Sequence, residues 1–201
     1  MAKPSWLNIS PASGSGNGTI SNSSGAHTGR LKREGIVTVT GSGVSTPVTY
    51  KVIQTPKAEF VNFDNGAELA VQKGGGAVTI TGKSNSAKLT FAWVGTSDVN
   101  LPANYVAAGE TTANGAAIAG DAGATAEFEY NLALNVPANG TTDEITRTLK
   151  VTANGGQSAQ IAIKQAAGDA FLSVAPTEIT IPQDGTAVSV QVTSNTDWSV
   201  S

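Results

Sequence analysis

The sequence AVTITGKSNS at residues 77–86 recurs as AVSVQVTSNT at residues 187–196, and the two stretches align without a gap. In both stretches apolar residues alternate with polar ones, which is the period of a half-buried antiparallel strand. Both stretches also follow a turn that contains glycine. The recurrence predicts a β-fold that is built more than once along the chain.

A second set of repeats marks the other end of the unit. LKVT at residues 149–152 matches VTVT at residues 37–40, and AQIAIKQ at 159–165 matches VTYKVIQ at 48–54. These matches predict three parts, namely the later strands of a sandwich, a complete and elaborated sandwich, and the early strands of a sandwich. The parts are residues 1–57, 58–168 and 169–201.

Turn residues and strand periodicity agree on the fold class. Helical periodicity is nearly absent, and Asn-Gly, a dipeptide that favours type I′ hairpin turns, occurs five times. We therefore predict an all-β chain of tandem immunoglobulin-like antiparallel sandwiches, one complete and one split between the two termini. An extra loop or hairpin is expected around residues 100–131. The Asn-Gly asparagines are Asn17, Asn65, Asn114, Asn139 and Asn154.

Composition narrows the classes of function. The 201 residues carry a net charge of −3 and no basic cluster, so nucleic acid is not a predicted partner. The sequence has no apolar run of 18 residues, so a membrane is not a predicted partner either. There is no cysteine, which excludes disulfides and thiolate metal sites. The opening MAKPSW does not read as a signal peptide. Either one has been removed, or the protein leaves its cell without secretion, as phage particle proteins do by lysis.

Several motifs together resemble the BACON family, immunoglobulin-like modules common in Bacteroidetes and in their phages. The opening of that family is similar to LSVAPT at residues 172–177, and its middle to TSNTDW at 193–198. Its later part is similar to SWLNISPASGSG at residues 5–16, and its closing strands to residues 36–54. The resemblance is weakest over residues 100–131. It implies a sandwich fold and a proposed carbohydrate- or mucin-binding role.

The residues give catalysis little support, and we predict no catalytic, cofactor-binding or metal-binding residue. The single histidine, His27, aligns with Asn139 of the central unit and is interpreted as a turn residue. Glu127 and Glu129 share one face of a predicted strand, where solvated charges are the simpler interpretation. An enzyme remains a third hypothesis, which hydrolytic activity lost on changing either glutamate would revive.

The aromatic residues fall into two groups. Trp6, Trp93 and Trp198 occupy framework-like or alternating positions, so we expect them in sandwich cores rather than against sugars. Tyr105 and Tyr130 flank the elaborated region. They are the candidate residues for contact with a ligand or partner.

A half-sandwich exposes an apolar face and unpaired strand edges, which invite pairing with another chain. Three outcomes are open. The tail of one subunit completes the head of the next, the chain closes on itself, or the chain is part of a longer array. The residues expected to form the core of the completed module are Trp6, Leu7, Val37, Val39, Val188, Val190 and Trp198.

Two functional hypotheses follow. The first is a non-enzymatic structural and interaction protein on a phage virion surface, such as a capsid decoration or a head or tail fibre. Its partners would be copies of itself, other virion proteins and glycans. The alternative is an extracellular carbohydrate- or mucin-binding module of a secreted Bacteroidetes glycan-utilisation protein.

Overall fold

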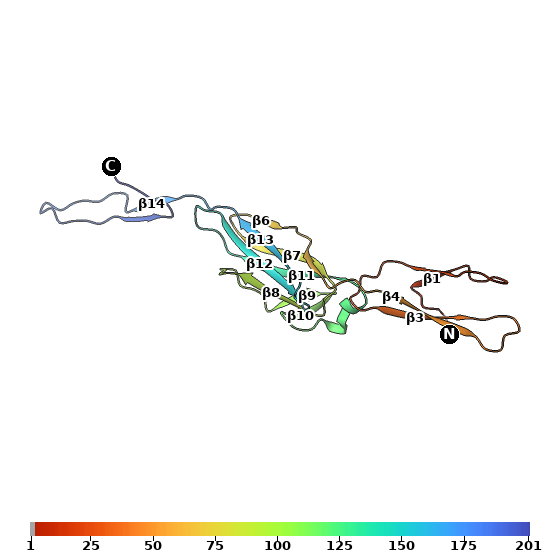
Figure 1. The fold of residues 1–201 in the computed structure, drawn as a ribbon. Helices are drawn as coiled ribbons and strands as arrows, with labels where there is room; N and C mark the ends of the chain where they lie inside the picture. The colour runs from red at the N-terminus through yellow and green to blue at the C-terminus, as the bar shows by residue number, and fades with distance from the viewer. Residues whose placement is uncertain (1–2) are drawn as a thin grey trace.

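The structure, a computed structural model, describes residues 3–201 and is built almost entirely from β-strands. Figure 1 shows an elongated molecule with a large sandwich in the middle. The strands that precede residue 57 lie at one end, and those that follow residue 169 lie at the other. The predicted all-β class is confirmed.

Two sheets form the central sandwich (residues 58–168). One sheet has the order β10-β9-β11-β7-β5, and all of its strands are antiparallel. Its strands are β5 (Val61–Phe63), β7 (Gly76–Ser84), β9 (Asn104–Ala107), β10 (Glu110–Ala113) and β11 (Phe128–Val136).

The second sheet has the order β6-β13-β12-β8 and lies against the first (Figure 1). Its β13 pairs antiparallel with β12 and parallel with β6, so residues about a hundred positions apart share one ladder. The strands are β6 (Glu68–Val71), β8 (Leu89–Val94), β12 (Ile145–Ala153) and β13 (Ser158–Gln165).

Apolar side chains from both sheets fill the space between them. Along β11 every second residue is buried, as the alternating sequence predicts. The Phe91 ring meets those of Tyr105 and Tyr130 edge to face, with centroids 5.0 and 5.6 Å apart. Trp93 packs against this core, and its indole Nε1 donates a hydrogen bond to the Val99 carbonyl at 2.9 Å.

The elaborated region contains a hairpin, β9–β10, followed by the 3₁₀ helix η1 (Ala119–Ala124). The hairpin turns at Ala108 and Gly109, both of which have positive φ. The helix has six residues, and none of the helices among residues 3–201 is long and apolar enough to cross a membrane.

The predicted type I′ turns at Asn-Gly are wrong. Within residues 3–201 the non-glycine residues with positive φ are Ala108 and Asp121, and no asparagine is among them. Asparagine side chains instead bond distant backbone: Asn114 Oδ1 accepts from Phe91 N at 2.8 Å, and Asn114 Nδ2 donates to Phe91 O at 3.0 Å. Asn65 Oδ1 likewise accepts from Thr81 N at 2.8 Å, whereas Asn139 Oδ1 accepts from Thr141 N at 2.9 Å, within its own turn.

The N-terminal piece (described residues 3–57) has two separate two-stranded antiparallel sheets. In one, β1 (Leu7–Ser10) pairs with β2 (Ser21–Ser24). In the other, β3 (Arg33–Val39) pairs with β4 (Val48–Gln54). Leu7 and Val37 are buried there.

The C-terminal piece (residues 169–201) is one short hairpin of β14 (Leu172–Ala175) and β15 (Gln191–Ser194). None of its residues is buried. The strand expected over residues 188–192 forms only from Gln191, because residues 185–190 have no ladder partner. A strand needs a neighbour for its backbone groups, and alternation alone does not supply one.

The core of the central sandwich gives the first testable prediction. Ile161 lies in β13 with no exposed surface, so Ile161→Ala removes buried methyl groups and leaves a cavity. We expect a loss of about 2–5 kcal/mol in the free energy of unfolding, measured by denaturant titration. Val94→Ala, at an exposed position of β8, should change it by about 0.5 kcal/mol or less. Equal effects of the two changes would contradict this core.

Candidate functional site

The two predicted contact residues, Tyr105 and Tyr130, lie in the core of the central sandwich. Both rings are buried, and each packs edge to face against Phe91. Burial raises the pKa of both hydroxyls, and the nearby Asp64 carboxylate adds to the shift at Tyr130. Neither ring can be a flat exposed surface for a sugar, which corrects the expectation from sequence.

Tyr130 lines a pocket of about 370 Å³, and its hydroxyl donates a hydrogen bond to the Asn62 carbonyl at 2.6 Å. Asp64 and Glu129 also line this pocket. Within residues 3–201, no group of three or more His, Asp or Glu side chains has the arrangement of a metal site.

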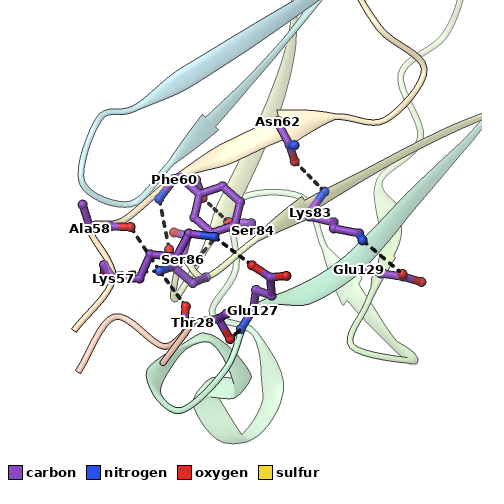
Figure 2. A network of polar contacts seen from close by, with 11 residues as sticks. Thr28, Lys57, Ala58, Phe60, Asn62, Lys83, Ser84, Ser86, Glu127 and Glu129 are labelled. Atoms are coloured by element: carbon purple, nitrogen blue, oxygen red, sulfur yellow. Dashed lines mark hydrogen bonds and ion pairs between the residues drawn. The ribbon is translucent and has the colours of Figure 1, made fainter. Parts of the chain in front are cut away.

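The side chains weighed for catalysis lie apart, each with its own partner. The Glu127 carboxylate pairs with Lys57 at 2.9 Å, and that of Glu129 lies 3.9 Å from Lys83. Figure 2 shows the first pair just before β11 begins and the second between β7 and β11. His27 Nε2 lies 2.6 Å from the Leu31 carbonyl, as a residue that supports a local turn would.

The residues expected in a completed module are only partly enclosed. Leu7 and Val37 are buried in the N-terminal piece, and Trp6 is half-buried beneath the Arg33 guanidinium, 4.7 Å from the ring centroid. Four others are exposed in the structure: Val39, Val188, Val190 and Trp198.

A cluster of polar contacts lies where the N-terminal piece meets the central sandwich. Asn85 Oδ1 accepts a hydrogen bond from Phe60 N at 3.0 Å, and its Nδ2 donates to the carbonyls of Ala58 and Thr28, each at 3.2 Å. Ser84 Oγ donates to Phe60 O at 2.7 Å. Figure 2 shows Thr28, Ala58 and Phe60 gathered at this point. One buried amide thus joins the early piece, the linker and β7.

Close backbone contacts strengthen this junction. Arg30 forms a two-pronged ion pair with Asp121 of η1, and Arg30 N donates to Gly123 O at 2.9 Å. The backbones approach so closely that a Cβ on Gly29 would lie 2.4 Å from the Thr125 carbonyl carbon. The N-terminal piece is therefore held against the central sandwich by both charge and shape.

The same bonds recur where the central sandwich meets the C-terminal piece. Asn195 Oδ1 accepts from Phe171 N at 2.9 Å, and its Nδ2 donates to the carbonyls of Asp169 and Gly140, each at 2.9 Å. Ser194 Oγ donates to Phe171 O at 3.0 Å. Asn195 is only half-buried, because less chain surrounds it.

The two junctions match position by position under the repeat alignment. The backbone bond from Lys57 N to Gly29 O, 2.9 Å, corresponds to that from Gly168 N to Thr141 O, 2.7 Å. A closing glutamine is also equivalent: Gln54 Nε2 donates to Gly25 O and Gln165 Nε2 to Pro137 O, both at 2.8 Å. The same set of hydrogen bonds therefore occurs at both junctions between neighbouring parts of the chain.

The buried Arg147 of β12 supports the second junction from inside the sandwich. Its Nη1 donates to Gln165 Oε1 at 2.9 Å, and its Nε and Nη2 pair with the Asp98 carboxylate. The Arg147 hydrogen bond holds the pKa of Asp98 below its ordinary value. This pair fixes the end of β13 from which the chain enters the C-terminal piece.

Comparison with known proteins adds little beyond fold. Neither the models of protein families nor the curated proteins include a match. Among solved structures, a Bacteroides ovatus GH5 xyloglucanase is 17% identical over 54% of this chain and 19% of its own, with a TM-score of 0.33. The surface layer protein SbsC, domains 4–9, is 12% identical over 81% of this chain and 24% of its own, with a TM-score of 0.36.

Protocadherin gamma B2 cadherin domains 1–5 are 10% identical over 96% of this chain and 38% of their own, with a TM-score of 0.37. The chain thus spans well under half the length of each of these structures. At such identities and TM-scores, the likeness adds nothing to what the two sheets already show about the fold.

The junction asparagines were not predicted to have a role, although the sequence contains their signal. Ser-Asn-Ser at residues 84–86 and Ser-Asn-Thr at 194–196 end the two repeats that decide the fold. A polar triplet kept after two copies of one strand indicates a bond that both copies make. What sequence could not supply was the far partner, Thr28 or Gly140.

The matched asparagines give a paired prediction. Asn85→Ala leaves the Phe60 amide and two carbonyls without their partner, so we expect a loss of about 1–3 kcal/mol in the free energy of unfolding. Asn195→Ala, at a half-buried position, should cost less. Hydrogen exchange should quicken at the Phe60 amide in the first variant and at the Phe171 amide in the second. Exchange unchanged at both amides would refute the junction bonds.

The Arg147–Asp98 pair predicts a pH dependence. Because the pKa of Asp98 is lowered in the folded state, its contribution is present above the unfolded pKa of about 3.9 and is lost as pH falls through the folded value. Asp98→Asn should therefore be less stable than the parent at neutral pH, and the gap should shrink toward about pH 2. Urea titrations across pH measure this. Glu110→Gln, at an exposed carboxylate, is the control, and a gap that is constant with pH would contradict the assignment.

Proposed function

We propose that this protein is a non-enzymatic structural and interaction protein, made of BACON-like sandwiches joined end to end. The observation that carries the proposal is the repeated junction. The Asn85 amide donates across the first junction to Thr28 O, and the equivalent Asn195 amide donates across the second to Gly140 O. The same serine and asparagine bonds to Phe60 and Phe171 hold each asparagine within its own unit. A set of junction bonds that occurs twice along one chain would build an extended array of sandwiches.

The contacts at the two junctions favour an array in which neighbouring units are held rigidly, and not one in which they are joined by flexible linkers. At the first junction the Asn85 amide and the Arg30–Asp121 ion pair tie three segments together. At the second, Asn195 is supported by the Lys73–Asp169 ion pair at 2.5 Å. Fixed joints between neighbouring sandwiches suit a protein that must hold a binding or assembly surface away from its support.

The setting that we propose is the surface of a phage virion, as a capsid decoration or a component of a head or tail fibre. Three features support it: the elongated shape, the cysteine-free composition and the sequence resemblance to modules that occur in phages. Other copies of the protein and other virion proteins would be its partners.

Glycan adhesion is the second candidate, either at the virion surface or in a secreted Bacteroidetes glycan-utilisation protein. One observation favours it: Trp198 is 52% exposed, as an aromatic residue that binds a sugar must be. The two buried tyrosines no longer support this function.

Immunogold labelling with an antibody against the chain tests the virion setting. We expect label on purified phage particles from lysates that contain the protein. Label confined to the cell surface or secreted fraction would overturn it. Glycan-array binding abolished by Trp198→Ala, with the unchanged fold checked by circular dichroism, would favour adhesion. Phe171→Ala, also at an exposed ring of the C-terminal piece, is the matched control.

A further inference from the structure

The two terminal pieces expose apolar side chains, and by the repeat alignment they correspond to opposite halves of one sandwich. In the C-terminal piece these are at Leu172, Val174, Ile181 and Val190, and in the N-terminal piece one is at Val39. Figure 1 shows the pieces at opposite ends of the molecule, so neither covers the other within this chain. Exposed apolar strands with free edges are costly in water and prone to pairing.

The central sandwich shows how such pieces fit. Its β7 pairs antiparallel with β11 from Ser84↔Phe128 to Gly76↔Val136, and its β6 pairs parallel with β13 from Glu68↔Ala162 to Val71↔Gln165. By the repeat alignment, β7 and β6 correspond to residues 186–194 and 178–181 of the C-terminal piece. The strands β11 and β13 correspond to β2 and β4 of the N-terminal piece.

We propose that the C-terminal piece of one copy completes the N-terminal piece of a second copy, giving a sandwich shared between two chains. This inference rests on the proposed structural role and names the partner. Residues 186–189 would pair antiparallel with β2, and residues 178–181 would pair parallel with residues 51–54. Both segments of the C-terminal piece have no ladder in the structure, and β2 and β4 each have one neighbour.

The burial of apolar side chains in the central sandwich indicates which side chains of the terminal pieces would be enclosed in a shared sandwich. Ile181 is 62% exposed and its counterpart Val71 is 6% exposed. Val190 is 37% exposed and its counterpart Ile80 is fully buried. Val39 is 41% exposed, whereas its counterpart Val151 is fully buried. Each position has a β-branched aliphatic side chain although more than a third of its surface is exposed in its own chain.

Polar groups also fit the shared sandwich. In the central sandwich Gln165 Nε2 donates to Pro137 O at 2.8 Å and to Lys73 O at 3.2 Å. The equivalent Gln54 Nε2 makes the first kind of bond, to Gly25. The equivalent of Lys73 is Gln183 of the C-terminal piece, whose carbonyl would supply the second bond from the next copy.

A lysine would also face the acidic residue in the shared sandwich, from a different position of the ladder. In the central sandwich Glu68 pairs with Lys164 at 2.7 Å, across the parallel ladder of β6 and β13. In the shared sandwich Glu178, the counterpart of Glu68, would lie beside Lys51 of β4, which takes the place of Ala162, whereas Lys164 corresponds to Ile53. The contact is head to tail, so successive copies form a ring if the rotation closes and a filament if it does not.

Solution mass across concentration tests the proposal on the 201-residue chain. We expect oligomers whose mass grows with concentration in multi-angle light scattering. Ile181→Asp places a charge in the proposed interface and should yield a monomer. Val94→Asp, at an exposed valine of the central sandwich, should leave the oligomers intact. A strict monomer at all concentrations, or equal loss in both variants, overturns the proposal.

Crosslinking identifies the register, and the absence of cysteine gives it no background. Ser21→Cys and Ser189→Cys chains, mixed and oxidised, should form a disulfide-linked mixed dimer, since Ser21 and Ser189 correspond to the paired Ala133 and Thr79. Ser21→Cys mixed with Thr96→Cys, at an exposed loop position, should not. Equal yields in the two mixtures would contradict the register.

These measurements separate the two levels of the argument. If the chain stays monomeric while Asn85→Ala and Asn195→Ala behave as predicted, the repeated junction stands and head-to-tail completion by a second copy fails. If the junction variants have no effect, the proposed structural role fails first.

Discussion

The parallel pairing of β6 with β13 is the constraint on which the sandwich depends. It joins Glu68–Val71 to residues 162–165 and so brings the early strands of the unit onto its closing hairpin. With this ladder made, the side chains of Val71, Ile161 and Ile163 are buried. In the terminal pieces the ladder has only one of its two strands. Ile181, which matches Val71, is exposed there, and Tyr50 and Val52, which match Ile161 and Ile163, are only half-buried. Strand alternation therefore produces a packed core only where both halves of the unit meet.

The junction asparagine makes a second kind of contact, which links neighbouring units instead of strands within one unit. A carboxamide can accept one bond and donate two, so a single side chain can hold a linker on both sides and reach the preceding unit as well. At Asn85 those bonds are enclosed, and at Asn195 they are made in a more open setting. The same geometry at two levels of burial indicates that the bonds are a property of the repeat and that surrounding packing only adds to them.

Much of this could be predicted from sequence, and the failures have physical causes. The repeat and the alternation predicted strands where β3, β4, β12 and β13 lie, because local patterns set which face of a strand is apolar. Asn-Gly did not predict turn type, since asparagine side chains were used for distant backbone such as Phe91. The burial of Tyr130 could have been predicted from the sequence, because Tyr130 alternates with Phe128 and Leu132 on the buried face of β11. The burial of Tyr105 could not, because its strand β9 pairs with β11 over only two positions.

Trp198 connects the two proposed functions and sets them against each other. It lies just beyond β15, at the place where the central sandwich passes from β7 toward β8 with Leu89 fully buried. A copy that completes its neighbour would enclose that region, whereas a copy that binds a sugar through the indole must keep it open. The large apolar area removed from water by completion favours the enclosed state wherever copies are concentrated. Adhesion through Trp198 would then be confined to the free end of an assembly, where no further copy covers the indole.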